Sequence, residues 1–93
     1  MKKLKENFKK YGETFTKVYE SDKAYIYSRM VGSVEYFEVF KKTYKNISDY
    51  VDGKYVKTDE LREYYPKDED FGKFAWCCRT IEKAKSYLPK IEN

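Results

Sequence analysis

The residue types that most often carry out chemistry in proteins are sparse in this chain. Among its 93 residues there is no histidine, which removes the commonest general base and the commonest metal ligand. The two cysteines, Cys77 and Cys78, are adjacent, and this strongly disfavours an ordinary disulfide between them. Without histidine or a second cysteine pair, the chain also lacks the four ligands that tetrahedral zinc requires. The sequence therefore predicts no catalytic residue, no metal site and no cofactor.

Acidic residues and glycines offer no better site. The acidic run 68–70 lacks the spacing of a calcium-binding loop, and such runs are usually solvated. Glu63 and Glu82 could form an acid–base pair only if they met, and nothing in the sequence brings them together. Gly53 and Gly72 are isolated, so no glycine-rich loop is available to hold a phosphate. We therefore predict that the protein is not an enzyme.

The net charge of +4 is concentrated at the N-terminus. Residues 1–10 contain five lysines and one glutamate, and the other 83 residues contain equal numbers of basic and acidic groups. Lysines of this kind can contact the phosphates of single-stranded nucleic acid while exposed tyrosines stack on its bases. The residues concerned are Lys2, Lys3, Lys5, Lys9 and Lys10, with Tyr25, Tyr27 and Tyr36. A simpler interpretation is that the lysines solubilise the terminus.

Short stretches rich in β-branched and aromatic residues predict an antiparallel sheet. Asp52-Gly53 between aromatic and β-branched residues is the strongest hairpin signal. The predicted strands cover residues 14–20, 24–31, 34–44 and the two sides of the hairpin within 47–56, with 61–65 as a further candidate. No long apolar run or apolar leader is present, which predicts no membrane span and a cytoplasmic protein with reduced cysteines.

The stretch Phe71–Ile91 allows two interpretations. In one, Phe71–Cys78 is a strand and Thr80 caps a helix that ends near Pro89. In the other, Asp70 caps a single helix that continues to Leu88. Gly72 favours the first, because glycine costs about 1 kcal/mol in a helix interior. We also expect Trp76 to be largely buried between the sheet and this helix.

The same stretch carries a resemblance. Tyr65-Pro66, Phe71-Gly72, Ala75-Trp76 and the run 80–84 (TIEKA) resemble the "YP…FG..AW….TLEKA" ending of small uncharacterised proteins of bacteriophage and prophage genomes. The match covers about the last third of the chain, and Ile81 stands where leucine is commoner. The resemblance implies a mobile-element origin in a bacterial host and carries no known activity.

Together these features predict an α+β fold in a single domain, residues 1–93. A meandering antiparallel sheet of four to five strands carries the C-terminal helix on one face. Leu4, Phe8 and Tyr11 have the spacing of a short amphipathic helix over residues 1–11, and a loosely held basic segment fits nearly as well. We expect residues 1–10 to be removable without unfolding, because termini are often loosely held.

The tyrosines suggest where such a domain binds. One helix covers only one sheet face, and we expect that face to carry Ile26 and Met30. Tyr25, Tyr27 and Phe37 are then expected on an exposed face that binds a protein partner or a second copy. Our first functional hypothesis is a non-enzymatic protein-binding module, with inhibitors of host defence proteins as one class. Single-stranded nucleic-acid binding is the second hypothesis.

Overall fold

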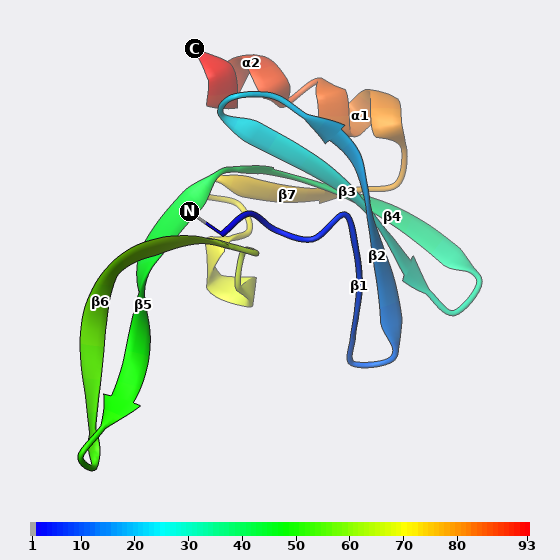
Figure 1. The fold of residues 1–93 in the computed structure, drawn as a ribbon. Helices are drawn as coiled ribbons and strands as arrows, with labels where there is room; N and C mark the ends of the chain where they lie inside the picture. Colours follow the sequence, from blue (N-terminus) through cyan, green and yellow to red (C-terminus); the bar gives the residue numbers. More distant parts are fainter. Residues whose placement is uncertain (1) are drawn as a thin grey trace.

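The structure is a computed structural model that describes residues 2–93. It contains a five-stranded antiparallel sheet of order β1-β2-β3-β4-β7, a two-stranded hairpin β5–β6 and short C-terminal helices (Figure 1). This arrangement confirms the predicted α+β class. Met1, the first residue of the predicted N-terminal segment, lies outside the described residues. The elements are β1 (Asn7–Lys10), β2 (Glu13–Glu20), β3 (Ala24–Val31), β4 (Val34–Lys41), β5 (Thr43–Val51), β6 (Lys54–Tyr64), η1 (Asp68–Asp70), β7 (Ala75–Cys78), α1 (Ile81–Lys85) and α2 (Leu88–Glu92).

A first core lies between the five-stranded sheet and the two helices. Side chains alternate along a strand, so Ala24 and Ile26 of β3 share the face that α1 and α2 cover. The expectation that the helices cover the Ile26 face is confirmed. The buried residues of this core are Ala24, Ile26, Val39, Cys78, Ala84, Leu88 and Ile91, with Tyr19, Phe37, Trp76 and Tyr87 packed at its edge.

A second core, almost entirely aromatic, lies on the opposite face of the sheet. Tyr25 and Tyr27 are 1% and 0% exposed, so the prediction that they face solvent is wrong. They pack with Phe15, Phe40 and Ala75. The cover comes from irregular segments and β1 rather than from a helix: Leu4, Phe8, Tyr65, Phe71 and Phe74. This sheet face is therefore closed by segments that form no helix.

Phe37 also lies elsewhere than predicted. The register of β3 and β4 places it opposite Ser28, on the helix-covered face. There it packs at the edge of the first core. Its expected position beside Tyr25 and Tyr27 on an exposed face is therefore wrong, because one step along a strand moves a side chain to the other face.

A short strand replaces the N-terminal helix that was predicted as one option. Strand β1 pairs with β2, and Phe8 lies opposite Phe15 with ring centroids 4.8 Å apart. Tyr11 and Gly12 form the connecting turn, with φ angles of 54° and 75°, as in two-residue hairpins of the primed types. Leu4 and Phe8 do share one core, but they reach it along an extended chain, so their helical spacing misled the prediction.

The C-terminal stretch follows the strand-then-helix interpretation. Strand β7 pairs with β4, and the Thr80 hydroxyl accepts the Lys83 N–H at 3.1 Å as the cap of α1. Pro89 does not end the helical region, because it sits in the first turn of α2, where a missing N–H costs nothing. Trp76 packs against the first core on the helix-covered face, as expected, where it is partly buried and stacks on Tyr87 with ring centroids 4.7 Å apart.

The hairpin β5–β6 projects from the body, and we call it the arm, residues 43–64 (Figure 1). The predicted single strand over 34–44 is divided, because β4 ends at Lys41 and β5 begins at Thr43. After this break β5 leaves the sheet, and β7 takes the place beside β4. The predicted turn is confirmed at Asp52 and Gly53, whose φ angles are 50° and 79°. The candidate strand 61–65 is the end of β6.

Candidate functional site

The two buried acids, Glu38 and Glu63, form hydrogen bonds with residues of the second core and its cover. Glu38 is 1% exposed and accepts hydrogen bonds from the Tyr65 hydroxyl at 2.7 Å and from Arg29 at 3.0 Å. Glu63 is 3% exposed and accepts the Tyr25 hydroxyl at 2.6 Å and the Leu4 N–H at 2.9 Å. Burial, together with these carboxylates, raises the pKa of both tyrosines. Each acid thus joins segments far apart in the sequence.

The two cysteines differ in environment. Cys78 is buried in the first core, whereas Cys77 is exposed on the other face of β7, opposite Glu38. Partial burial and the nearby Glu38 carboxylate raise the pKa of Cys77 to about 11, and burial raises the pKa of Cys78. Both shifts disfavour the thiolate, whereas a reactive cysteine has a lowered pKa that favours it.

The remaining acidic candidates lie apart from these groups. The run 68–70 forms η1, and the Asp70 carboxylate accepts the Lys67 N–H at 2.9 Å. Glu82 is exposed on α1 and is not a partner of the buried Glu63. Within residues 2–93 no group of acids and cysteines is arranged to hold a metal ion.

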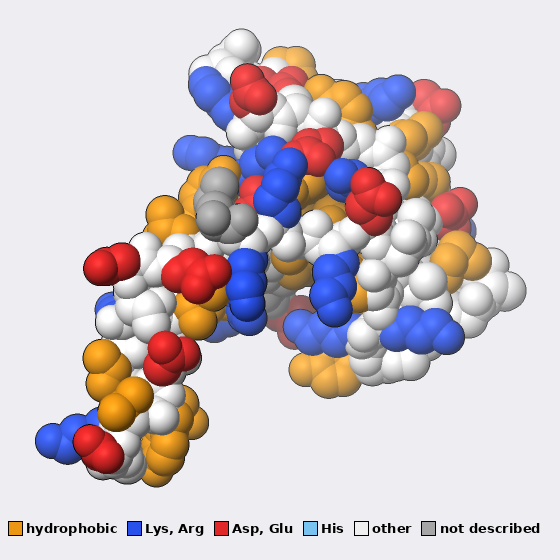
Figure 2. All heavy atoms as spheres, viewed as in Figure 1, with side chains coloured by type: hydrophobic (Ala, Val, Ile, Leu, Met, Phe, Trp, Pro, Cys, Tyr) orange, Lys and Arg blue, Asp and Glu red, His pale blue; other side chains and the backbone are white. Residues whose placement is uncertain are grey.

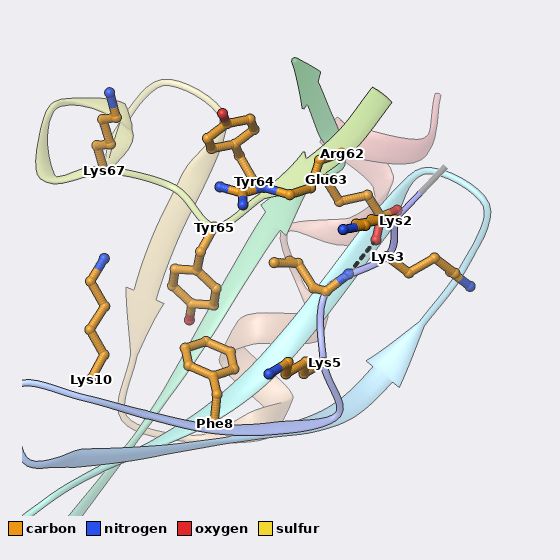
Figure 3. A pocket seen from close by; sticks show the side chains of 11 residues that line it. Lys2, Lys3, Lys5, Phe8, Lys10, Arg62, Glu63, Tyr64, Tyr65 and Lys67 are labelled. Carbon is orange, nitrogen blue, oxygen red and sulfur yellow. Dashed lines mark hydrogen bonds between the residues drawn. The ribbon is translucent and has the colours of Figure 1, made fainter. Parts of the chain in front are cut away.

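Most of the predicted lysines meet in a hollow at the base of the arm. We call this cavity of about 580 Å³ the basic hollow. Leu4, Phe8, Tyr64 and Tyr65 line it, and Glu63 is the one acidic residue in its lining. We call the surface formed by Phe8 and Tyr65 the floor of the hollow. Figure 3 shows Phe8 and Tyr65 in the middle, with Lys10 and Lys67 on one side and Arg62 on the other. The cations that line the basic hollow are Lys2, Lys3, Lys5, Lys10, Arg62 and Lys67.

Sequence reasoning identified four of these six cations. Lys9 does not line the hollow. It is next to Lys10 in strand β1, so its side chain lies on the opposite face of the strand. Arg62 and Lys67 were missed, since they lie some fifty residues beyond the lysine-rich segment. Backbone pairing brings them in: the Lys2 N–H donates to Leu61 at 3.0 Å, and the Glu63 N–H donates to the Lys2 carbonyl at 2.9 Å. No local pattern signals such a pairing.

The arm carries most of the exposed apolar side chains. Nine large hydrophobic residues are exposed in the described part of the chain, and six of them lie on the arm: Tyr44, Tyr50, Val51, Tyr55, Val56 and Leu61. Tyr50 and Tyr55 form a cross-strand pair near the tip, with centroids 5.1 Å apart in an edge-to-face arrangement. Val51 and Val56 lie on the other face of the hairpin. Figure 2 shows these hydrophobic side chains along the projecting arm.

Comparison of the chain with protein-family models, curated proteins and solved structures finds no match. In the part of the chain that the structure describes, no helix is long and apolar enough to cross a membrane. The case for a function therefore depends on the two surfaces just described.

Proposed function

We propose that the protein is a protein-binding module whose contact surface is the outer part of the arm. The observation that carries this proposal is the pair Tyr50 and Tyr55, 67% and 79% exposed at the tip of a hairpin that projects from the body. Tyrosine is enriched among residues that dominate binding energy. Because Tyr25 and Tyr27 are buried, the arm replaces the sheet face as the contact surface.

The physical state of the arm supports this proposal. An isolated two-stranded hairpin is marginally stable in water, because it buries little apolar surface. Strands β5 and β6 form their own two-stranded sheet, and its outer part shows apolar side chains on both faces. A partner with an apolar groove would bury both faces and stabilise the hairpin. The arm has four basic and five acidic residues, so its near-neutral charge suits a protein groove better than a polyanion.

The resemblance of the C-terminal third to phage and prophage proteins directs the proposal toward a bacterial host protein as the partner. Small phage proteins often act by occluding a surface of a host protein, and an inhibitor of a defence protein is one form of this activity. The step from origin to inhibitor rests on analogy. The step from the arm to binding rests on exposed side chains.

Affinity capture from a bacterial lysate tests the proposal. The test variant is Tyr50→Ser with Tyr55→Ser, and the matched control is Tyr11→Ser, since Tyr11 is 90% exposed but lies outside the arm. All three proteins should melt alike, because exposed substitutions change stability by about 0.5 kcal/mol or less. We expect wild type and control to retain the same host protein and the test variant to lose it. Equal retention by all three would contradict the proposal.

A further inference from the structure

We propose that the basic hollow is a binding site for single-stranded nucleic acid, independent of the protein contact at the arm tip. The first observation is the concentration of charge. The hollow gathers six of the 20 basic residues and one of the 16 acids. The rest of the chain holds 14 basic and 15 acidic residues, so the hollow accounts for the whole positive balance of the protein. Figure 2 shows Lys and Arg side chains gathered between the arm and the body.

The second observation is that most of these cations have no acidic partner. Among the described residues, Lys3 is the one cation of the hollow that forms a salt bridge, with Glu20 at 2.7 Å. Glu63 is occupied by the Tyr25 hydroxyl and the Leu4 N–H. The hollow thus brings together like charges without neutralising them, at a cost that a bound polyanion would offset. The cations concerned are Lys2, Lys5, Lys10, Arg62 and Lys67.

The third observation is the floor of the hollow, which distinguishes between polyanions. Phe8 and Tyr65 are half-buried, and both line the cavity between the charged walls. Positive walls with aromatic side chains are the two components of sites for single strands. An acidic peptide would use the charges alone, whereas a nucleotide can also place its base against the exposed part of these rings. A cavity of about 580 Å³ has the size of a small-ligand pocket, which suits a nucleotide unit better than a stacked duplex.

The rings of Phe8 and Tyr65 offer a bound base an apolar surface to lie against, but neither ring has a face left free for full stacking. Phe8 already stacks on Phe15, and Tyr65 packs its ring against Phe8 at 5.6 Å. Lys45 and Arg62 lie over the Tyr64 ring at 4.7 and 5.0 Å. The phosphates therefore supply most of the affinity, and sequence preference should be weak. Binding should accordingly depend strongly on salt, because each phosphate contact releases a counterion.

Fluorescence anisotropy with labelled oligothymidylate of about 12 nucleotides tests the proposal, since sites for single strands span roughly 4–16 nucleotides. The test variant is Lys10→Gln with Arg62→Gln, which removes one cation from each side of the hollow. The control is Lys9→Gln with Lys85→Gln, which removes the same charge from exposed positions that do not line it. Lys9 and Lys10 are neighbours in β1, so the two variants differ there only in whether the lost charge lines the hollow.

We expect wild type and control to bind alike and the test variant to bind more weakly. Each lost contact should weaken binding about fivefold near 0.1 M salt and reduce the slope of log K against log salt by about 0.7. Equal weakening in both variants would overturn the proposal, as would no binding at low salt. Tighter binding of a duplex of equal length, or of polyglutamate, would overturn the assignment to a single strand. The arm-tip variant Tyr50→Ser with Tyr55→Ser should bind the oligonucleotide normally, which separates this test from that of the protein contact.

Discussion

At the scale of single residues, Glu20 holds the N-terminal segment against the sheet. Its carboxylate contacts the ammonium groups of Lys3, Lys17 and Lys42 at 2.7, 2.8 and 2.8 Å. Hydrogen bonds from Lys17, Lys3 and Lys42 hold the pKa of Glu20 well below its ordinary value of 4.5. A carboxylate with a lowered pKa stabilises the folded state above the ordinary pKa, and this stabilisation is lost as the pH falls below it.

We therefore expect Glu20 to contribute to the loss of folding stability at acidic pH. Glu20→Gln should cost about 1 kcal/mol at pH 7, and the difference from wild type should shrink as the pH falls below about 4. Urea unfolding at a series of pH values measures both quantities. Glu60→Gln, at an exposed position on the arm, is the control and should leave the curve unchanged. A constant difference between Glu20→Gln and wild type at every pH would contradict this role.

Tyr27 is the residue for which sequence and structure give opposite expectations. On the exposed face where the sequence predicts Tyr25 and Tyr27, their double substitution by Ser would leave the fold intact. In the structure Tyr27 is 0% exposed, its ring lies between Phe8 and Phe40, and its hydroxyl donates to the Lys5 carbonyl at 2.7 Å. We expect Tyr27→Ser alone to cost about 3–5 kcal/mol, whereas Tyr11→Ser should melt like wild type. Melting of Tyr27→Ser within a few degrees of wild type would show that the second core does not support the fold.

At the scale of elements, β1 and the segment before it cover the second core. Removal of residues 1–10 deletes Leu4 and Phe8 and exposes Phe15 and Tyr27. We therefore expect a chain that starts at Tyr11 to lose its cooperative thermal transition, contrary to the expectation from the sequence. Phe8→Ala in the full chain should cost about 2 kcal/mol, the transfer free energy of a large side chain.

Asn7→Ala is the matched control for Phe8→Ala, because Asn7 is exposed on the same strand. Circular dichroism melts of the four proteins give the comparison. A truncated chain that unfolds cooperatively near the wild-type temperature would show that residues 2–10 are dispensable, as their high charge first suggested.

The elements that could be predicted are those with a local signal. The turn at Asp52-Gly53, the cap at Thr80 and the strands β2 and β3 each depend on a few neighbouring residues, and all four appear in the structure. The departure of β5 from the sheet and the pairing of Lys2 with β6 depend on contacts between distant segments. Alternation along β3 correctly separated Ile26 from Tyr27, but it could not show which segments close the second face.

The same limit applies to the candidate sites. Four lysines of the basic hollow were identified from the charge of residues 1–10, whereas Arg62 and Lys67 join them only through the fold. The tyrosines of the arm are exposed because the hairpin projects from the body, and no local sequence pattern predicts that projection. Tyr50 and Tyr55 flank the predicted turn. The predicted turn was therefore the one feature of the sequence that could have located the proposed contact surface.

At the scale of the whole molecule, two surfaces of different character lie at opposite ends of the arm. The body is closed by two cores, one on each face of the sheet. The basic hollow lies where the N-terminal segment pairs with β6, and the apolar pair Tyr50 and Tyr55 lies at the far end of the hairpin. This separation would allow the proposed protein partner and nucleic acid to bind without competing for the same side chains.

The measurement that tests the protein contact most directly is photo-crosslinking in bacterial cells. A photoreactive phenylalanine derivative replaces Tyr55 at the arm tip or, as the control, Tyr11, both of which are highly exposed. Immunoblotting after irradiation then detects any protein joined to the 11.3 kDa chain. The proposed function requires a discrete, heavier adduct with the probe at position 55 and none with the probe at position 11. No adduct from position 55, or the same adducts from both positions, would contradict the assignment of the arm as the protein-binding surface.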